Sequence, residues 1–387
     1  MKKIARLLYN VRMNTYRIIP VQTKKDIKRF MRFPFAFYEG NPYWVPLLQS
    51  DERKIFKPSY SYNETCDTAF FLCVNDVDEA VGRVEGIIQR AANAKWNQKR
   101  VRFTRFDCID DQEVANLLLD AVASWGKENG MDELVGPLGY SDFEREGLLI
   151  EGFDQPQTYE EQYNHDYYQR LLETYGLAKE VDWLEYHVHL PEKKDPRLAV
   201  VAERAKKQYG LTFYQPKKVS KFVKQYKEQF FELVDDTYNK IYGTVPFTEK
   251  MMNEAIASFN LILRPQDFGV VFNAEKKMVG FSLMFPSISK IVAKYKGKIT
   301  PRFLIEFLKN KKHPEVIDLG LIGVRPEYMM QGVAGIIVNE LTEGLIAAKV
   351  DYFETNLMLE DNLSILGFMS NFPHEQVKKR RCFVKKL

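Results

Sequence analysis

The sequence predicts a mixed α/β protein made of two similar domains, and three observations point to it. The chain has 387 residues, more than twice the usual length of one domain, which favours two hydrophobic cores. The same order of strand and helix patterns occurs in both halves. Charge and proline interrupt the pattern at residues 191–196. We therefore expect a basic N-terminal arm at residues 1–14, one domain at 15–190 and a second at 191–387.

The first half begins with an apolar strand at residues 16–20, and a helical pattern follows from about residue 24. Apolar stretches on both sides of a polar turn predict a hairpin at residues 70–83. The remaining patterns predict a strand at 101–106, a helix at 113–125, a strand at 133–135, a helix at 164–175 and a strand at 182–190.

The second half repeats this order. It begins with a strand at 211–215 and a helix at 222–238, and a hairpin follows at 268–281 around another polar turn. The remaining patterns predict a strand at 316–324, a helix at 332–348, a strand at 352–356, a helix at 362–371 and a strand at 378–385. These strands and helices define the fold class as α/β with a mixed sheet in each domain.

Composition excludes several classes of function. Apolar residues make up 45% and charged residues 28% of the chain, values that exclude collagen-like, disordered and polytopic membrane proteins. The net charge is only +4, too balanced for a dedicated nucleic-acid binder. The four cysteines and five histidines lack metal-ligand spacing, and no apolar run approaches the ~18 residues of a membrane span. We expect a cytoplasmic protein without a metal.

The segment 318–335 has the strongest chemical signal. An apolar strand ends before Pro326, and a glycine-containing turn opens a helix with a buried stripe of Ile337, Leu341 and Leu345. First-turn amides of such a helix lack internal partners and lie at the positive end of its dipole, so they can hold a pyrophosphate. The alternative is ordinary turn chemistry, for which glycine is equally suited.

The order of elements around this segment resembles the GNAT superfamily of acyl-CoA N-acyltransferases. Its signature, Q/R-x-x-G-x-G/A, follows the fourth strand and binds the CoA pyrophosphate. Gln331 matches the first position, Ala334 stands where the family has glycine, and Ile336 stands where it usually has a small residue. The resemblance covers residues 210–387.

The first half shares the order of elements with this family but differs at the phosphate loop. Residues 107–112 are rich in aspartate, which would repel the cofactor. The stretches 136–141, 147–154 and 163–168, with 359–362, are similar to bacterial tandem GNAT-like proteins of this length. Some of those relatives resemble bacterial ceramide synthases, which acylate a sphingoid amine.

The resemblance implies acetyl-CoA or a longer acyl-CoA as co-substrate and assigns its contacts. Asn362 would contact the pantetheine arm, although asparagine is also a favoured helix N-cap. The remaining cofactor-binding positions are Leu321, Ile322, Gly323 and Val324 on the strand, and Gln331, Gly332, Val333, Ala334 and Gly335 in the turn.

Amine acylation needs a proton acceptor for the amine and a proton source for the leaving thiolate. Glu354 is our first candidate base, the alternative being a solvated charge at a strand end, and Asp318 is the second. The family's usual acidic tyrosine falls on Met369, which cannot donate a proton. Tyr352, Tyr328 or His374 then substitutes for it, or the thiolate leaves unassisted, or the domain is not catalytic.

Other segments suggest where an acceptor binds. Tyr163, Asn164 and Tyr167 would face an interdomain cleft and bind the substrate. Lys290–Lys312 is strongly basic and interleaved with apolar residues, which fits a cover near the acyl site, a contact with a membrane surface, or a solvated helix face. Met1–Arg12 has a similar composition and allows the same membrane or solvated interpretations.

The sequence thus leads to one hypothesis and two alternatives. The main hypothesis is an acyl-CoA-dependent N-acyltransferase that transfers an acetyl or longer acyl group to a primary amine. One alternative is an inactive GNAT-like protein that binds a ligand or partner, and the other is a long-chain acyltransferase acting on a sphingoid-type lipid amine. We expect no nucleic-acid partner and a cytoplasmic location, with peripheral contact with the inner membrane if the acceptor is a lipid.

Overall fold

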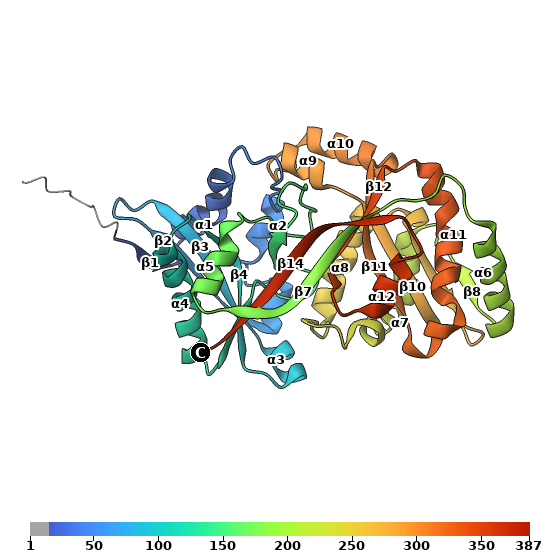
Figure 1. Ribbon diagram of the computed structural model, residues 1–387, viewed down its shortest axis with the longest axis horizontal. Helices are drawn as coiled ribbons and strands as arrows, with labels where there is room; N and C mark the ends of the chain where they lie inside the picture. The colour runs from blue at the N-terminus through green and yellow to red at the C-terminus, as the bar shows by residue number, and fades with distance from the viewer. Residues whose placement is uncertain (1–14) are drawn as a thin grey trace, which may run out of the picture.

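A computed structural model describes residues 15–387; the expected basic arm at 1–14 lies outside them. The first half contains the strands and helices on the left of Figure 1. They are β1 (Arg17–Pro20), α1 (Lys24–Phe37), α2 (Gln49–Lys54), β2 (Cys66–Val74), β3 (Ala80–Gln89), α3 (Arg90–Trp96), β4 (Arg100–Cys108), α4 (Gln112–Glu128), β5 (Glu133–Gly136), β6 (Leu148–Glu151), α5 (Tyr167–Thr174) and β7 (Ala178–Val188), with a 3-10 turn at Ser61–Glu64.

The second half repeats this order with additional helices. Its elements are α6 (Pro196–Tyr209), β8 (Thr212–Tyr214), α7 (Val219–Tyr238), α8 (Glu249–Ile262), β9 (Phe268–Phe272), β10 (Met278–Pro286), α9 (Ser289–Lys294), α10 (Pro301–Lys312), β11 (Val316–Val324), α11 (Val333–Ala348), β12 (Tyr352–Thr355), β13 (Met358–Leu359), α12 (Leu363–Met369) and β14 (His374–Lys386), with 3-10 turns at Pro265–Asp267 and Pro326–Gln331. Within residues 15–387 no helix has both the length and the apolar character needed to cross a membrane.

Helix α6 begins at the end of the break expected at residues 191–196, and the sequence analysis did not predict it. Asp195 caps it by accepting a hydrogen bond from the Arg197 amide, Pro196 stands in its first turn, and Gly210 ends it in the left-handed conformation. These are standard start and stop signals of a helix. The helix packs its buried Ala202 and Ala205 into the second core.

One mixed sheet runs through both halves. Its strand order is β1-β2-β3-β4-β5-β14-β7-β12-β11-β10-β9-β8, with β6 on β14 and β13 on β7. The last strand of each half therefore pairs with the other half: β14 lies antiparallel to β5, and β7 lies antiparallel to β12. Figure 1 shows β7 in green and β14 in red running side by side between the two lobes. The mixed α/β class expected from the sequence is confirmed.

The two parallel pairs at the centre of the sheet separate after a few residues. Strand β4 pairs with β5 only from Arg100 to Arg102, and β11 pairs with β12 only from Val316 to Leu319. Beyond Leu319, β11 continues along β10 alone to Val324. The second half therefore opens a gap between β11 and β12.

Helices cover the sheet and form separate hydrophobic cores. Helix α4 packs on β2, β3 and β4 in the first core, and α11 packs with α6 in the second. Helix α7 packs on β10 and β11 in a third, aromatic-rich core. Phe383 of β14 is fully buried in the first core, although it lies at the far end of the chain.

Because β14 comes from the second half but packs in the first core, we predict that Phe383→Ala destabilises the first half. Deleting a buried phenylalanine side chain costs about 3–5 kcal/mol. Chemical denaturation would measure the loss, and hydrogen exchange should show faster exchange in α4 and β5. Val77→Ala, at a side chain 64% exposed, is the control and should change little. Faster hydrogen exchange confined to α11 and β12 would contradict the pairing of β14 with the first half.

Candidate functional site

A cavity of about 1130 Å³ lies between the two halves. The second half contributes the end of β11, one side of α11 and the segment after β12, with mostly apolar side chains. The first half contributes nearly all of the charge. The carboxylates that line the cavity are Asp51, Glu52, Asp107, Asp142, Glu144, Glu146, Glu160, Glu161 and Glu254, and the cations are Lys54, Arg83, Arg105 and Arg145. The wall therefore has excess negative charge at one end and an apolar surface at the other.

The N-terminus of α11 lies beside this cavity with its first amides free of side-chain caps. Gly332 is the N-cap residue in the left-handed conformation, with φ 76°, and among the described residues no side chain bonds this helix start. Ala334 lines the cavity, and a Cβ added to Gly335 would meet nothing within 4 Å. The turn before the helix is anchored by Arg325, whose Nε donates to the Met278 carbonyl at 2.8 Å. The geometry leaves room for an anionic group.

The corresponding helix of the first half differs in this respect. The Asp111 carboxylate caps α4 by accepting from the Glu113 amide at 2.8 Å. Asp110 and Glu113 add negative charge on either side. An anion at this helix start would meet both an occupied amide and repulsion.

Ile336 does not crowd the α11 turn. Its side chain is fully buried in the core shared with α6, because a residue three positions after Val333 returns to the same face of the helix. Gln331 contacts its own turn, where its side-chain amide donates to the Glu327 carbonyl at 3.0 Å. The large side chain at position 336 therefore packs in the core and leaves the turn free.

The predicted strand donors lie at the gap between β11 and β12, and Leu321, Ile322, Gly323 and Val324 all line the cavity. At the centre, the backbone of Ile322 is bonded to the Tyr238 hydroxyl, which accepts from its amide at 3.2 Å and lies 2.9 Å from its carbonyl. Tyr238 comes from α7 and also lines the cavity. The sequence analysis did not identify this hydroxyl, because its position depends on the packing of α7 against β11.

Glu354 is an ion-paired residue rather than a solvated charge. It is buried on β12, bonded to Lys378 of β14 and 3.8 Å from His187 Nε2. Burial alone would raise its pKa, but the contacts with His187 and Lys378 outweigh burial and hold the pKa below its usual value. A low pKa makes a weak base.

Asp318 has the opposite environment. Both of its carboxylate oxygens are buried without a hydrogen-bond partner among the described residues. Burial, followed by the charges of Glu160 and Glu354, raises its pKa well above the usual range. Asp318 and Glu354 do not line the cavity directly. They lie on the opposite side of the strands from Ile317 and Phe353, since strand side chains alternate.

Glu160, which the sequence analysis did not single out, lies in the loop before α5 and lines the cavity. Burial raises its pKa to about 7, with the charge of Glu354 adding to the effect. Within residues 15–387 it forms no ion pair. Sequence reasoning missed Glu160 because the carboxylate whose charge raises its pKa, Glu354, lies in the other half of the chain.

The other predicted residues lie in different surroundings. Tyr352 packs on His187 with the two rings tilted by 30° and their centroids 4.0 Å apart, and burial raises its pKa to about 12. Asn362 lines the cavity and also caps α12, accepting from the Ile365 amide at 3.4 Å, so both of its expected roles remain compatible. Met369 is buried in the second core and reaches the cavity.

Of the three residues expected to bind substrate, Tyr163 alone lines the cavity. Asn164 is buried and bridges the backbone of Leu149, accepting from its amide at 2.7 Å and donating to its carbonyl at 3.0 Å. The Tyr167 hydroxyl donates to the Cys108 carbonyl at 2.8 Å. Asn164 and Tyr167 therefore stabilise loops around the first core.

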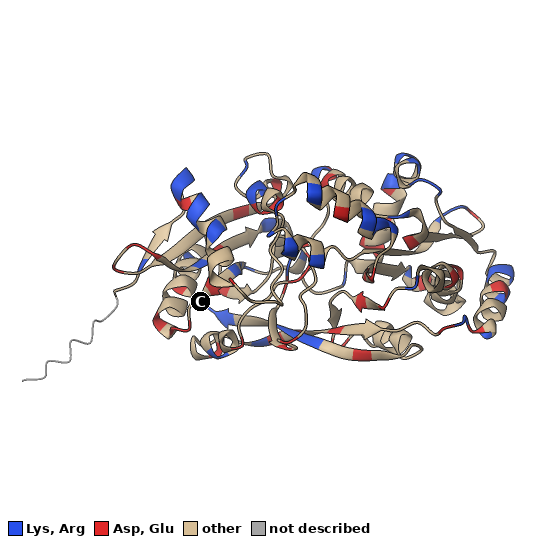
Figure 2. Ribbon diagram, turned by 90° about the horizontal axis from the view of Figure 1, so that it is seen from above, with Lys and Arg blue, Asp and Glu red and all other residues tan. Residues whose placement is uncertain are grey.

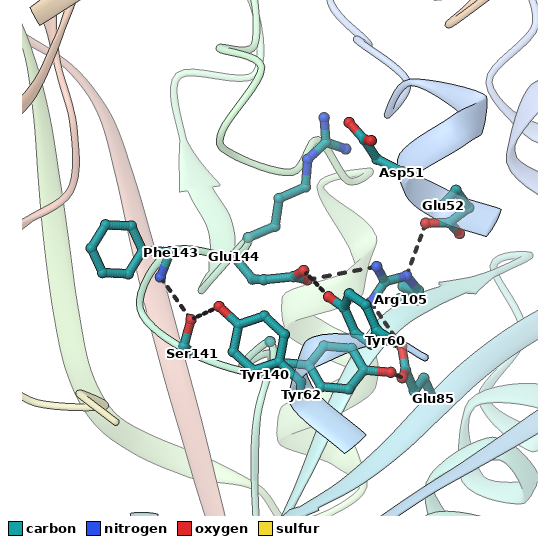
Figure 3. A network of polar contacts seen from close by, with 12 residues as sticks. Asp51, Glu52, Tyr60, Tyr62, Glu85, Arg105, Tyr140, Ser141, Phe143 and Glu144 are labelled. Carbon is teal, nitrogen blue, oxygen red and sulfur yellow. Dashed lines mark hydrogen bonds and ion pairs between the residues drawn. The ribbon is translucent and has the colours of Figure 1, made fainter. Parts of the chain in front are cut away.

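A polar network forms the first-half end of the cavity (Figure 3). Arg105, in the left-handed conformation, donates to Glu52 at 3.0 Å and to Glu85 at 2.8 Å, and lies 3.6 Å from Glu144. The Tyr60 hydroxyl donates to Glu144 at 2.8 Å. Tyr60, Arg105 and Glu144 all line the cavity, so this network fixes its polar wall.

The fold defined by these elements is that of the GNAT acyltransferases, present in tandem. Over 96% of this chain and 98% of the other, it superposes on a tandem GNAT protein from the clavulanic acid biosynthesis pathway with a TM-score of 0.55 and 10% identity. It also superposes on a GCN5-related N-acetyltransferase from Sphaerobacter thermophilus, over 96% and 95% of the two chains, with a TM-score of 0.50 and 12% identity. The expected tandem GNAT fold is confirmed.

Two curated proteins are similar in sequence to this chain along almost their whole length. Protein YghO of Escherichia coli strain K12 is 23% identical over 373 residues, 94% of each chain. Bacterial ceramide synthase of Caulobacter vibrioides is 23% identical over 392 residues, 96% of this chain and 97% of the other. No family model matches the chain.

The raised pKa of Glu160 predicts a pH-dependent stability. Its folded-state value of about 7 lies above the ~4.3 of an unfolded chain, so the folded state holds the proton more tightly. Its contribution to stability is fully present below about pH 4 and is lost as the pH rises through 7. Glu160→Gln should reduce the fall in unfolding free energy between pH 5 and 8 by on the order of 2 kcal/mol.

Urea denaturation across this pH range would measure the difference. Glu151→Gln, at an exposed glutamate, is the matched control and should leave the profile unchanged. Equal pH slopes for wild type and Glu160→Gln would show that Glu160 is not held protonated.

Proposed function

We propose that the protein is an acyl-CoA-dependent N-acyltransferase that transfers an acetyl or longer acyl group to a primary amine. The observation that carries this proposal is the gap between β11 and β12 beside the open N-terminus of α11, both facing one cavity. In this interpretation the second half, residues 191–387, holds the donor, and the first half, residues 15–190, shapes the acceptor end.

The α11 turn supplies the donors for the pyrophosphate of CoA. The amides of Val333, Ala334 and Gly335 lack intrahelical partners because they form the first turn. The helix start favours a register in which the glycine of the GNAT signature falls on Gly332 and the final small residue on Ala334. Met329, rather than Gln331, then occupies the first position. Asn362 and the backbone of β11 lie along the path toward the gap.

The acidic wall suits a protonated amine acceptor. Nine carboxyl groups and four cations line the cavity. Burial raises the pKa of Glu146 and Glu161 well above the usual range, but the other carboxylates still outnumber the cations. A positively charged group is attracted to this excess of negative charge. The bound thioester supplies an activated acyl group, while the protein must remove a proton from the amine. Glu160 is the cavity carboxylate best suited to accept it, because its pKa of about 7 matches neutral pH.

Asp318 and Glu354 remain proposed members of this site. They do not line the cavity and would act through their charges on Glu160. The charge of Glu354 raises the pKa of Glu160, and Asp318 lies within electrostatic range of both. On the donor side, the Tyr238 hydroxyl lies at the edge of β11 and can protonate a leaving thiolate. It would supply the function that Met369 cannot, and it is better placed than Tyr352, whose ring packs on His187.

A long-chain lipid amine is the second candidate acceptor. The cavity, at about 1130 Å³, combines an apolar half with an acidic half, which suits an amine that carries a hydrocarbon chain. One similar protein is named bacterial ceramide synthase. The proposal keeps the cytoplasmic location expected from the sequence, with peripheral contact with the inner membrane in this second case. An inactive binding protein is the remaining alternative.

Calorimetric titration with acetyl-CoA and palmitoyl-CoA tests the donor site. Gly335→Glu places a charge at the open turn and should weaken donor binding about 10-fold through repulsion. Gly344→Glu is the matched control, because it lies on the same helix with nothing within 4 Å of its added Cβ. Failure of wild type to bind either donor would favour the inactive protein, and equal binding by both variants would place the donor elsewhere.

Release of free CoA in the presence of primary amines tests the acceptor chemistry. Glu160→Gln should lower kcat about 10²- to 10⁴-fold with donor affinity retained, because proton transfer by a positioned side chain contributes that much. Tyr238→Phe should also lower kcat. Glu151→Gln should match wild type. Full activity of Glu160→Gln would remove it from the mechanism, and a preference for palmitoyl-CoA with long-chain amines would favour the lipid acceptor.

A further inference from the structure

The surface around α10 exposes large apolar side chains that nothing in residues 15–387 covers. Leu304, Ile305 and Leu308 on the helix are 48%, 55% and 63% exposed, while Phe303 and Phe307 face the core. Ile299 just before the helix is 51% exposed, and Leu261 at the end of α8 is 61% exposed. We call these five exposed residues the α10 surface.

Leu261 and the leucines of α10 lie close together. Lys311 Nζ donates to the Leu261 carbonyl at 2.6 Å, which joins the end of α8 to α10. Leu304 and Leu308 precede Lys311 by seven and three residues, a spacing that puts all three on one side of a helix. The next residue of α8, Ile262, packs against the hydrophobic cluster that contains the buried phenylalanines of α10. The exposed leucines of both helices therefore contribute to one patch.

Positive charge surrounds the α10 surface. Residues 290–312 contain eight lysines and arginines and one carboxylate, Glu306, a net charge of +7 where the whole chain has only +4. Glu306 pairs with Lys294. Within residues 15–387, Lys298, Arg302, Lys309 and Lys312 form no ion pair. Figure 2, seen from the side of α9 and α10, shows lysines and arginines on these helices.

The α10 surface also borders the cavity. Leu261 and Ile299 are both exposed to solvent and among the residues that line it. An object that covers the α10 surface would therefore lie against part of the cavity lining. The chemistry required of that object is an apolar layer beneath a negatively charged face.

We propose that the α10 surface docks on the face of an anionic lipid bilayer, with its leucines and isoleucines among the acyl chains and its lysines at the headgroups. A basic helix with an exposed apolar face is the form in which peripheral proteins bind such a surface. A nucleic acid offers negative charge but no layer for the exposed leucines. The inference does not depend on the proposed function, although docking would present the cavity to membrane lipids.

Co-sedimentation of the full chain with lipid vesicles tests this surface. Vesicles with 30% phosphatidylglycerol in phosphatidylcholine should bind wild type at low salt, and binding should fall as ionic strength rises. Leu304→Glu with Leu308→Glu should lower the partition coefficient at least 10-fold. Lys309→Gln and Lys312→Gln should each lower it roughly 5-fold.

Val200→Glu with Val201→Glu is the matched control, because these α6 side chains are 70% and 56% exposed and lie away from α10. It should bind as wild type does, and circular dichroism would confirm that every variant is folded. Absent binding by wild type, equal binding to pure phosphatidylcholine, or undiminished binding by the α10 double variant would overturn the proposal. A concentration-dependent dimer abolished by that double variant would instead assign the face to self-association.

Discussion

The pairing of β7 with β14 is the interaction on which the rest of the structure depends. These strands carry charges that are buried at the junction: Arg380 donates to Glu185 at 2.5 Å, and Lys378 bonds both Glu185 and Glu354. Buried charges are costly unless paired, and a shift of one residue would move every side chain to the other face of the sheet. These buried ion pairs therefore fix the register of β7 against β14. Because β14 and β7 lie between β5 and β12 in the sheet, the same register sets how the two halves are joined.

This junction explains why one cavity has two different walls. The exchanged strands join the first half, with Glu160 and the polar network around Arg105, to the second half, with the gap between β11 and β12. The two halves share a fold but differ at one turn, where the α11 amides are open to an anion and the α4 start is capped and acidic. Glu160 and Asp318, one from each half, belong to the same electrostatic cluster.

Much of the fold could be predicted because local patterns and structure agree. The expected strand at 316–324 matches β11, and the expected helix at 113–125 lies within α4. The glycine turn at the start of α11 was predicted from the same short-range chemistry. Helix α6 was missed although Asp195, Pro196 and Gly210 mark its ends, since the proline and charges there were interpreted as a linker. The site was less predictable. Asn164 and Tyr167 have local polar patterns that suggest ligand binding, but their hydrogen bonds go to nearby backbone.

The sequence by itself determined the order of elements, the repetition of that order and the contrast between an acidic and a glycine-rich helix start, because each depends on residues within a few positions of one another. The tertiary structure alone decided which half each terminal strand joins, that Glu354 forms an ion pair with Lys378, and that Tyr238 reaches the backbone of Ile322. These contacts join residues far apart along the chain. Their chemistry depends on burial and on distance in space, which no local pattern of residues contains.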